Sequence, residues 1–140
     1  MKSTILSILI LAFAPWIVAA ESPTLGTAED AVLHLQQIWR GSLASKLKGS
    51  PFFPSLQHQM FEPNRVGARR TSAVEAWKHV SGKLTPQERQ TLILVGKLDD
   101  LKRDRPVWVV TNPGDLGSGF EAYLDATTGE VLFLWIGPEG

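Results

Sequence analysis

Three histidines are the side chains of this 140-residue chain best suited to bind a metal or to transfer protons. His34, His58 and His79 lie far apart in the sequence, and no two have the spacing that places a pair of ligands on one helix face. None has a carboxylate as its sequence neighbour, and the chain has no cysteine to complete a ligand set. We therefore expect no metal and no cofactor.

Other residues that enzymes use occur here in patterns typical of turns. Gly117-Ser118-Gly119 lacks the flanking residues of a nucleophile elbow, and no Gly-Lys-Ser/Thr phosphate loop follows it. Asp99-Asp100 is a pair of carboxylates, but the basic and acidic residues that follow at 102–105 indicate a solvated turn between two strands. The sequence thus predicts a protein that is not an enzyme.

Charge is unevenly distributed along the chain, although the formal net charge is zero. Eight basic and two acidic residues lie between positions 40 and 83, whereas five basic and nine acidic residues follow from position 84. Either the two parts complement each other in the fold, which is the preferred interpretation, or the basic segment binds anions. The candidate surface for a partner or an anion comprises Lys46, Lys48, Phe52, Phe53, Arg65, Arg69 and Arg70.

The N-terminus has the features of a secretory signal. Lys2 provides a basic start, an apolar run extends from Ile5 to Phe13, and Val18 and Ala20 suit the shallow pockets of signal peptidase. The apolar stretch is shorter than the about 20 residues that span a bilayer, and Pro15 interrupts it. We expect a signal peptide over 1–20, cleavage after Ala20 and export to the periplasm or the medium. No transmembrane span is expected after cleavage.

The mature segment 21–140 has the length of a single domain. Apolar residues at helical spacing predict a first helix over 28–40, which ends at a glycine, and a second over about 71–81. Residues 42–69 show no sustained period and contain several prolines and glycines. This segment is predicted to be a long loop or to hold short helical turns, and its aromatic residues are expected to anchor it to the core.

The second half of the chain predicts β-structure. After a single helical turn, strands are expected over about 91–98, 107–111, 120–124 and 131–136. Apolar and polar side chains alternate over 120–124, as in a half-buried strand. Asp125 to Gly129 is predicted to form a tight turn in which the aspartate accepts backbone N–H groups. The predicted fold class is α+β, an antiparallel four-stranded meander with one or two amphipathic helices on a face.

Two segments resemble the C-terminal half of a PepSY domain. They are PVWVV at 106–110 and GFEAYLDATTGEVL at 119–132, which contains the family pattern Y-x-D-x-x-T-G-E-V. The order of one helix and four strands extends the resemblance over about 71–136. In that alignment the helix at 28–40 and the loop at 42–69 precede the family domain. Alternatively the helix at 28–40 is the family helix, because Thr27-Ala28-Glu29-Asp30 fits the entry motif better.

The resemblance implies an exported accessory module of the kind thought to bind or restrain peptidases, without an active site. We therefore predict a non-catalytic module that holds a peptidase or another envelope protein against its sheet face or at an edge strand. The alternative is an envelope protein that docks on anionic lipid or cell-wall polymer through its basic middle segment, with Phe52 and Phe53. Nucleic acid is not an expected partner.

Overall fold

In the computed structural model of the chain, residues 24–114 and 119–137 are described, so the expected signal peptide lies outside the described residues. The described elements follow one another as α2 (Ala28–Ile38), a π-helical segment η1 (Trp39–Leu43), α3 (Ala44–Leu47), α4 (Phe53–Met60), β1 (Gly67–Ser72), α5 (Ala73–Ser81), α6 (Pro86–Leu92), β2 (Ile93–Val95), a 3₁₀ turn η2 (Leu98–Leu101), β3 (Pro106–Asn112), β4 (Gly119–Asp125) and β5 (Val131–Gly137). Among the described helices, none has the length and apolar character needed to cross a membrane.

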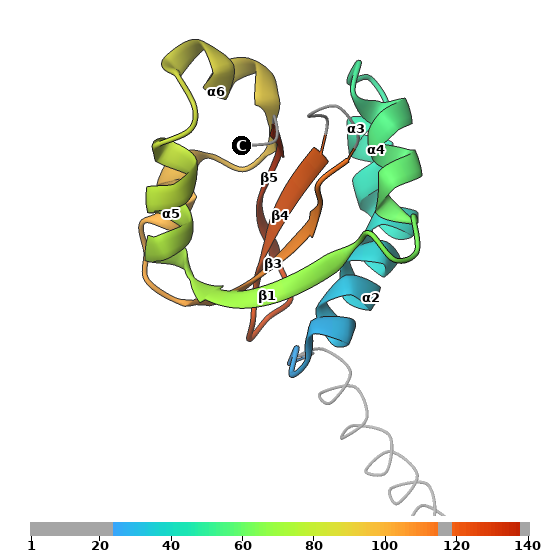
Figure 1. Ribbon diagram of the computed structural model, residues 1–140, viewed down its shortest axis with the longest axis horizontal. Helices are drawn as coiled ribbons and strands as arrows, with labels where there is room; N and C mark the ends of the chain where they lie inside the picture. Colours follow the sequence, from blue (N-terminus) through green and yellow to red (C-terminus); the bar gives the residue numbers. More distant parts are fainter. Residues whose placement is uncertain (1–23, 115–118, 138–140) are drawn as a thin grey trace, which may run out of the picture.

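The predicted α+β class is confirmed, with all strand pairs antiparallel. The sheet has five strands in the order β1-β3-β4-β5-β2 (Figure 1). The expected four-strand meander is therefore correct only for β3, β4 and β5. β2 pairs with β5 at the far edge, because the place beside β3 is occupied by β1, a strand that the sequence reasoning did not find.

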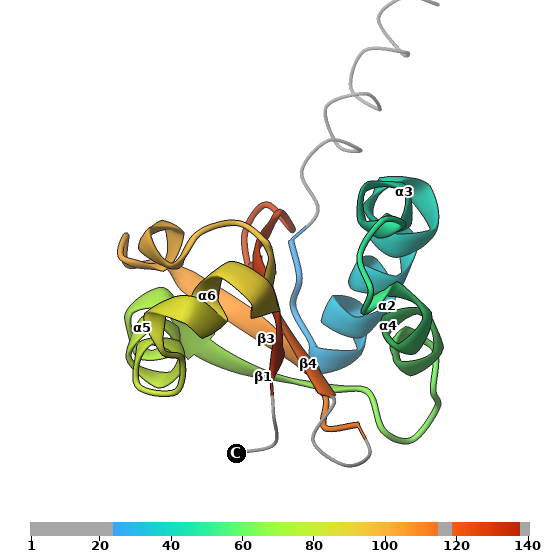
Figure 2. The same ribbon diagram turned by 90° about the horizontal axis from the view of Figure 1, so that it is seen from above.

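Helices cover both faces of the sheet. The sequence had predicted helices on one face only. Figures 1 and 2 show α2, α3 and α4 on one side of the strands and α5 and α6 on the other. Two groups of core residues result. Those on the α2 side include Leu35, Trp39, Leu56, Trp108, Val110 and Phe120, and those on the α5 side include Ala76, Val80, Leu101, Val109, Tyr123 and Trp135.

The central strands are consequently buried on both faces. Along β3, Val107 and Val109 pack on the α5 side, whereas Trp108 and Val110 pack on the α2 side. Uninterrupted apolar runs such as VWVV and VLFLWI are typical of strands buried in this way. The interpretation of 120–124 as half-buried was wrong, because Tyr123 on the supposed solvent face has no exposed surface.

The segment 42–69, predicted to be a long loop or to hold short helical turns, contains α3, α4 and the first half of β1. Gly41 does not end the first helix, because the chain continues through η1 with Trp39 and Leu43 both buried. The wider π turn brings these two side chains, four residues apart, onto the core. Thr85 and Glu88 form the predicted capping box, but the helix after it extends to Leu92, so β2 is shorter than the strand expected over 91–98.

Candidate functional site

The two phenylalanines of the predicted surface are anchors of the helical layer. Phe52 and Phe53 are partly buried and pack against the core on the α2 side. The ring of Phe53 stacks on that of Trp39, with their centroids 5.6 Å apart. The indole N–H of Trp39 in turn donates a hydrogen bond to Gln57 of α4. Phe52 and Phe53 therefore attach α4 to the core. This is the role expected from the sequence for the aromatic residues of 42–69.

The basic residues of the predicted surface lie on different elements. Lys46 and Lys48 are exposed on and just after α3. Arg65 contacts Glu62, with 3.6 Å between Nη1 and Oε1, and donates to the carbonyl of Gly114 at 2.8 Å. Arg69 and Arg70 are both exposed on β1, where successive side chains point to opposite faces of the sheet. The structure thus places Arg69 and Arg70 on one strand, Lys46 and Lys48 at one helix end, and Arg65 in the connection between α4 and β1.

The histidines have structural partners. His34 Nε2 donates to the carbonyl of Gly129 at 2.9 Å and ties α2 to the β4–β5 turn. His58 is highly exposed, with its Nε2 3.9 Å from Glu62. His79 Nε2 lies 3.4 Å from Glu121 Oε2. Within residues 24–114 and 119–137, no three His, Cys, Asp or Glu side chains are arranged to hold a metal ion.

A polar cluster beneath α5 was not foreseen from the sequence. Glu121 Oε1 accepts hydrogen bonds from the Tyr123 hydroxyl at 2.5 Å and from the Trp135 indole N–H at 2.9 Å. Burial and the neighbouring Glu121 carboxylate raise the pKa of Tyr123 far above its usual value, so the phenol remains a donor. With His79 beside its other oxygen, Glu121 has protein partners at both oxygens. The cluster therefore joins α5, β4 and β5, and within the described residues His79 Nε2 is buried there without a hydrogen bond.

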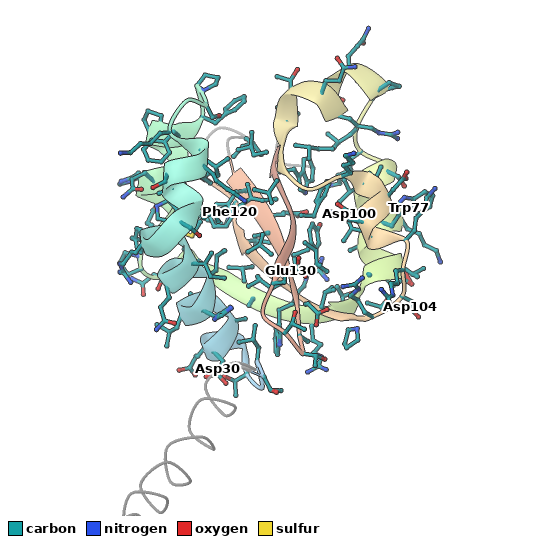
Figure 3. All side chains as sticks on the ribbon, turned by 180° about the vertical axis from the view of Figure 1, so that it is seen from behind. Asp30, Trp77, Asp100, Asp104, Phe120 and Glu130 are labelled. Atoms are coloured by element: carbon teal, nitrogen blue, oxygen red, sulfur yellow. The ribbon has the colours of Figure 1, made fainter. Side chains whose placement is uncertain are left out.

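A hollow of about 470 Å³ lies beside η2 and the start of β5. Figure 3 labels two of its lining residues, Asp100 from η2 and Glu130 from the turn before β5. Asp100 accepts a hydrogen bond from the backbone N–H of Lys97 at 2.8 Å. Arg105, also in the lining, forms an ion pair with Asp125 at 3.1 Å. Asp100 and Arg105 therefore have partners within the fold, and the lining as a whole combines acidic and basic side chains.

The exposed edge of β1 is the strongest candidate for a binding site. Ala73 N donates to Arg105 O at 2.9 Å, and Ala126 N donates to Pro106 O at 3.0 Å. Since hydrogen-bonded and non-hydrogen-bonded pairs alternate along an antiparallel ladder, Arg69 bonds to Val109 of β3. The backbone groups of Ala68 and Arg70 consequently point outward. They have no hydrogen-bond partner among the described residues.

The two arginines on this edge are also unpaired. Neither Arg69 nor Arg70 forms an ion pair within the part of the chain that the structure describes. The guanidinium of Arg70 lies over the Trp108 ring, 5.6 Å from its centroid, on the α2 side of the sheet. Arg69 lies on the other side, where its charge lowers the pKa of Tyr123 but is outweighed by burial. Each arginine therefore has an exposed cation beside an unpaired strand edge.

The opposite edge of the sheet offers much less backbone. β2 has three residues, and its register against β5 shifts between Ile93 and Val95. Gly96 follows with a positive φ of 76° and packs closely against the backbone of Leu132 in β5. Short, irregular edge strands resist pairing with other chains. β1, with six residues, is therefore the edge at which this sheet can be extended.

Comparisons with known proteins give no relative. No family model, no curated protein and no solved structure matches the chain. The resemblance to PepSY domains therefore remains a prediction from the residues at 106–110 and 119–132.

Proposed function

We propose that this protein is an exported, non-catalytic binding module, PepSY-like in its C-terminal part. It holds an extended segment of a peptidase or another envelope protein by strand addition at β1. The observation that carries the proposal is the open edge of β1, where the N–H and C=O groups of Ala68 and Arg70 have no partner among the described residues. Main-chain hydrogen bonds to such an edge supply affinity in many peptide-binding domains.

Two further features support this function. The N-terminal residues have the pattern of a secretory signal, which supports a partner outside the cytoplasm. Glu121 beneath α5 and Asp100 and Arg105 beside η2 have hydrogen-bond or ion-pair partners within the fold. The outward backbone groups of β1 have none among the described residues. The basic residues named for the alternative, docking on anionic lipid or polymer, are divided among α3, the connection before β1 and β1 itself, and no observation favours that function.

The test replaces Arg70 by proline. Because the Arg70 N–H faces outward, Arg70→Pro removes a donor from the open edge without removing a hydrogen bond to β3. Arg70→Ala removes the same side chain and keeps the donor, so it is the matched control. The exported form of each variant is immobilised and incubated with native envelope extract, and the retained proteins are identified by mass spectrometry.

Strand addition predicts a protein partner that the wild type and Arg70→Ala retain and that Arg70→Pro loses. The thermal midpoint of each variant checks that the fold is preserved. Equal retention by Arg70→Pro and wild type would place binding elsewhere on the molecule. Retention of anionic lipid or polymer alone, lost at high salt, would instead favour the electrostatic alternative.

A further inference from the structure

We infer that the segment bound at β1 carries two consecutive acidic residues, one facing Arg69 and the other facing Arg70. This inference rests on the proposed strand addition and specifies the chemistry of its partner. Cross-strand neighbours on the same face of a sheet interact directly, and opposite charges there stabilise the pair. A partner strand at the β1 edge places its successive side chains beside the two arginines in turn.

The need for consecutive acids follows from the positions of the two arginines. Arg69 is opposite Val109 and lies on the α5 side, and Arg70 is opposite Trp108 and lies on the α2 side. A partner with acids at positions i and i+2 presents both carboxylates on one face and reaches only one arginine. Acids at i and i+1 reach both. The strand geometry therefore predicts the spacing of the two acidic residues in the partner sequence.

The acidic character of the proposed partner segment follows from the absence of ion pairs at Arg69 and Arg70 among the described residues. Both guanidinium groups are without an ion pair among the described residues, and the ring of Trp108 supports Arg70 from one side. Arginine presents a planar set of donors that matches a carboxylate at two points. A second copy of β1 would instead bring arginines together, and like charges on paired strands destabilise the pairing. The edge thus favours an acidic segment of another protein over self-association.

Three peptides of equal length test this inference. The first is Thr-Val-Thr-Asp-Asp-Val-Thr-Val, with consecutive acids. The second, Thr-Val-Asp-Thr-Asp-Val-Thr-Val, has the same composition with the acids separated. The third replaces both acids of the first by asparagine. Affinity is measured by NMR titration of the exported protein at about 0.15 M salt, where long-range electrostatics are screened. Amide exchange at Ala68 and Arg70 is followed in the same samples.

We expect the consecutive-acid peptide to bind at least about threefold more tightly than the separated one, as one additional cross-strand ion pair provides. The neutral peptide should bind most weakly. Arg69→Ala should abolish the difference between the two acidic peptides, because a single arginine then remains. Slower exchange is expected at the outward amides of Ala68 and Arg70.

Two contrary results are distinguishable. Equal affinities of the two acidic peptides, with Ala68 and Arg70 protected, would overturn the consecutive-acid rule and leave strand addition intact. If no peptide protects these two amides, whether or not it binds, strand addition at β1 is itself refuted and the inference falls with it.

Discussion

At the scale of single residues, the turn between β4 and β5 depends on Asp125 and Gly129. Asp125 Oδ1 accepts from the backbone N–H groups of Thr127 and Thr128, at 2.8 and 3.1 Å. Gly129 has a positive φ of 78°, and its carbonyl accepts from His34. A Cβ at this glycine would lie 2.4 Å from His34 Nε2. The turn thus couples a backbone constraint to a contact with α2.

Gly129→Ala is therefore expected to lower the free energy of unfolding by about 1–3 kcal/mol, from left-handed backbone strain and displacement of His34. Urea unfolding followed by circular dichroism measures the change. Gly41→Ala is the matched control, because a Cβ there meets no atom within 4 Å and alanine favours helix. Equal losses in both variants would contradict the role assigned to Gly129.

The carboxylate of Asp125 makes stability depend on pH. Burial opposes its ionisation, but the N–H groups of Thr127 and Thr128 and the Arg105 guanidinium outweigh burial and lower the pKa. A folded-state pKa below the unfolded value stabilises the fold above about pH 4, and this contribution is lost as the pH falls through the folded-state pKa. Acid should therefore destabilise the wild type progressively from about pH 4 downward.

Asp125→Asn removes this titration and the ion pair with Arg105. We expect a loss of about 1–3 kcal/mol at neutral pH and a shallower decline in acid. Urea midpoints between about pH 2 and pH 7 provide the measurement. The stability of Arg105→Gln should lie between those of the wild type and Asp125→Asn, since Arg105→Gln retains both backbone hydrogen bonds to Asp125. An unchanged acid decline in Asp125→Asn would assign the pH dependence to other groups.

The turn at Asp125 could be predicted from the residues within it. The tertiary contacts of Glu121 could not be predicted from its sequence neighbours. The caps at Thr27, Ser72 and Thr85 and the turn at Asp125 depend on residues within a few positions, so their patterns are visible in the sequence. The partners of Glu121 come from α5, β4 and β5. The one signal for that cluster is a glutamate within an otherwise apolar strand, and this alone does not name its partners.

At the scale of elements, strands with an apolar core face were found and β1 was not. The sequence GARRTS has no apolar alternation, because β1 lies at an edge with most of its side chains exposed or half-buried. Its strand conformation comes from pairing with β3, a contact between residues about forty positions apart. The edge position of β1 therefore explains both why its sequence lacks an apolar pattern and why it is the candidate binding edge.

The sequence analysis allowed short helical turns in the 42–69 segment but did not place them, for a different reason. α4 buries Leu56 and Met60 on one side, but it has eight residues, which is short for a periodic pattern to be recognised. Pro54 in its first turn is compatible with a helix, but prolines spaced through a segment without a periodic pattern indicate a loop as readily as a short helix. α4 is therefore stabilised mainly by tertiary packing, including the stacking of Phe53 on Trp39.

At the scale of the whole molecule, the two core groups share the central strands. Trp39 lies in the group on the α2 side, and Trp135 lies in the group on the α5 side. Side chains of β3, β4 and β5 belong to both groups, so neither helical layer has a core that is independent of the sheet. The chain also has no cysteine that could hold a layer in place. Both layers are therefore expected to unfold together.

Fluorine-labelled tryptophan gives separate NMR signals that test this expectation. The folded signals of Trp39 and Trp135 should disappear at the same urea concentration, with one midpoint for both. The circular dichroism transition should coincide with them. An earlier midpoint for either tryptophan would show that one helical layer detaches while the sheet remains.

The unequal edges of the sheet also determine the stoichiometry of any complex formed by strand addition. The proposal places one strand at the long edge of β1 and none at β2, which is short and shifted in register. A protein with two open edges would link its partners into chains of increasing length. Under the proposed strand addition, assembly would therefore end after a single partner, and the expected product is a complex of one module and one partner.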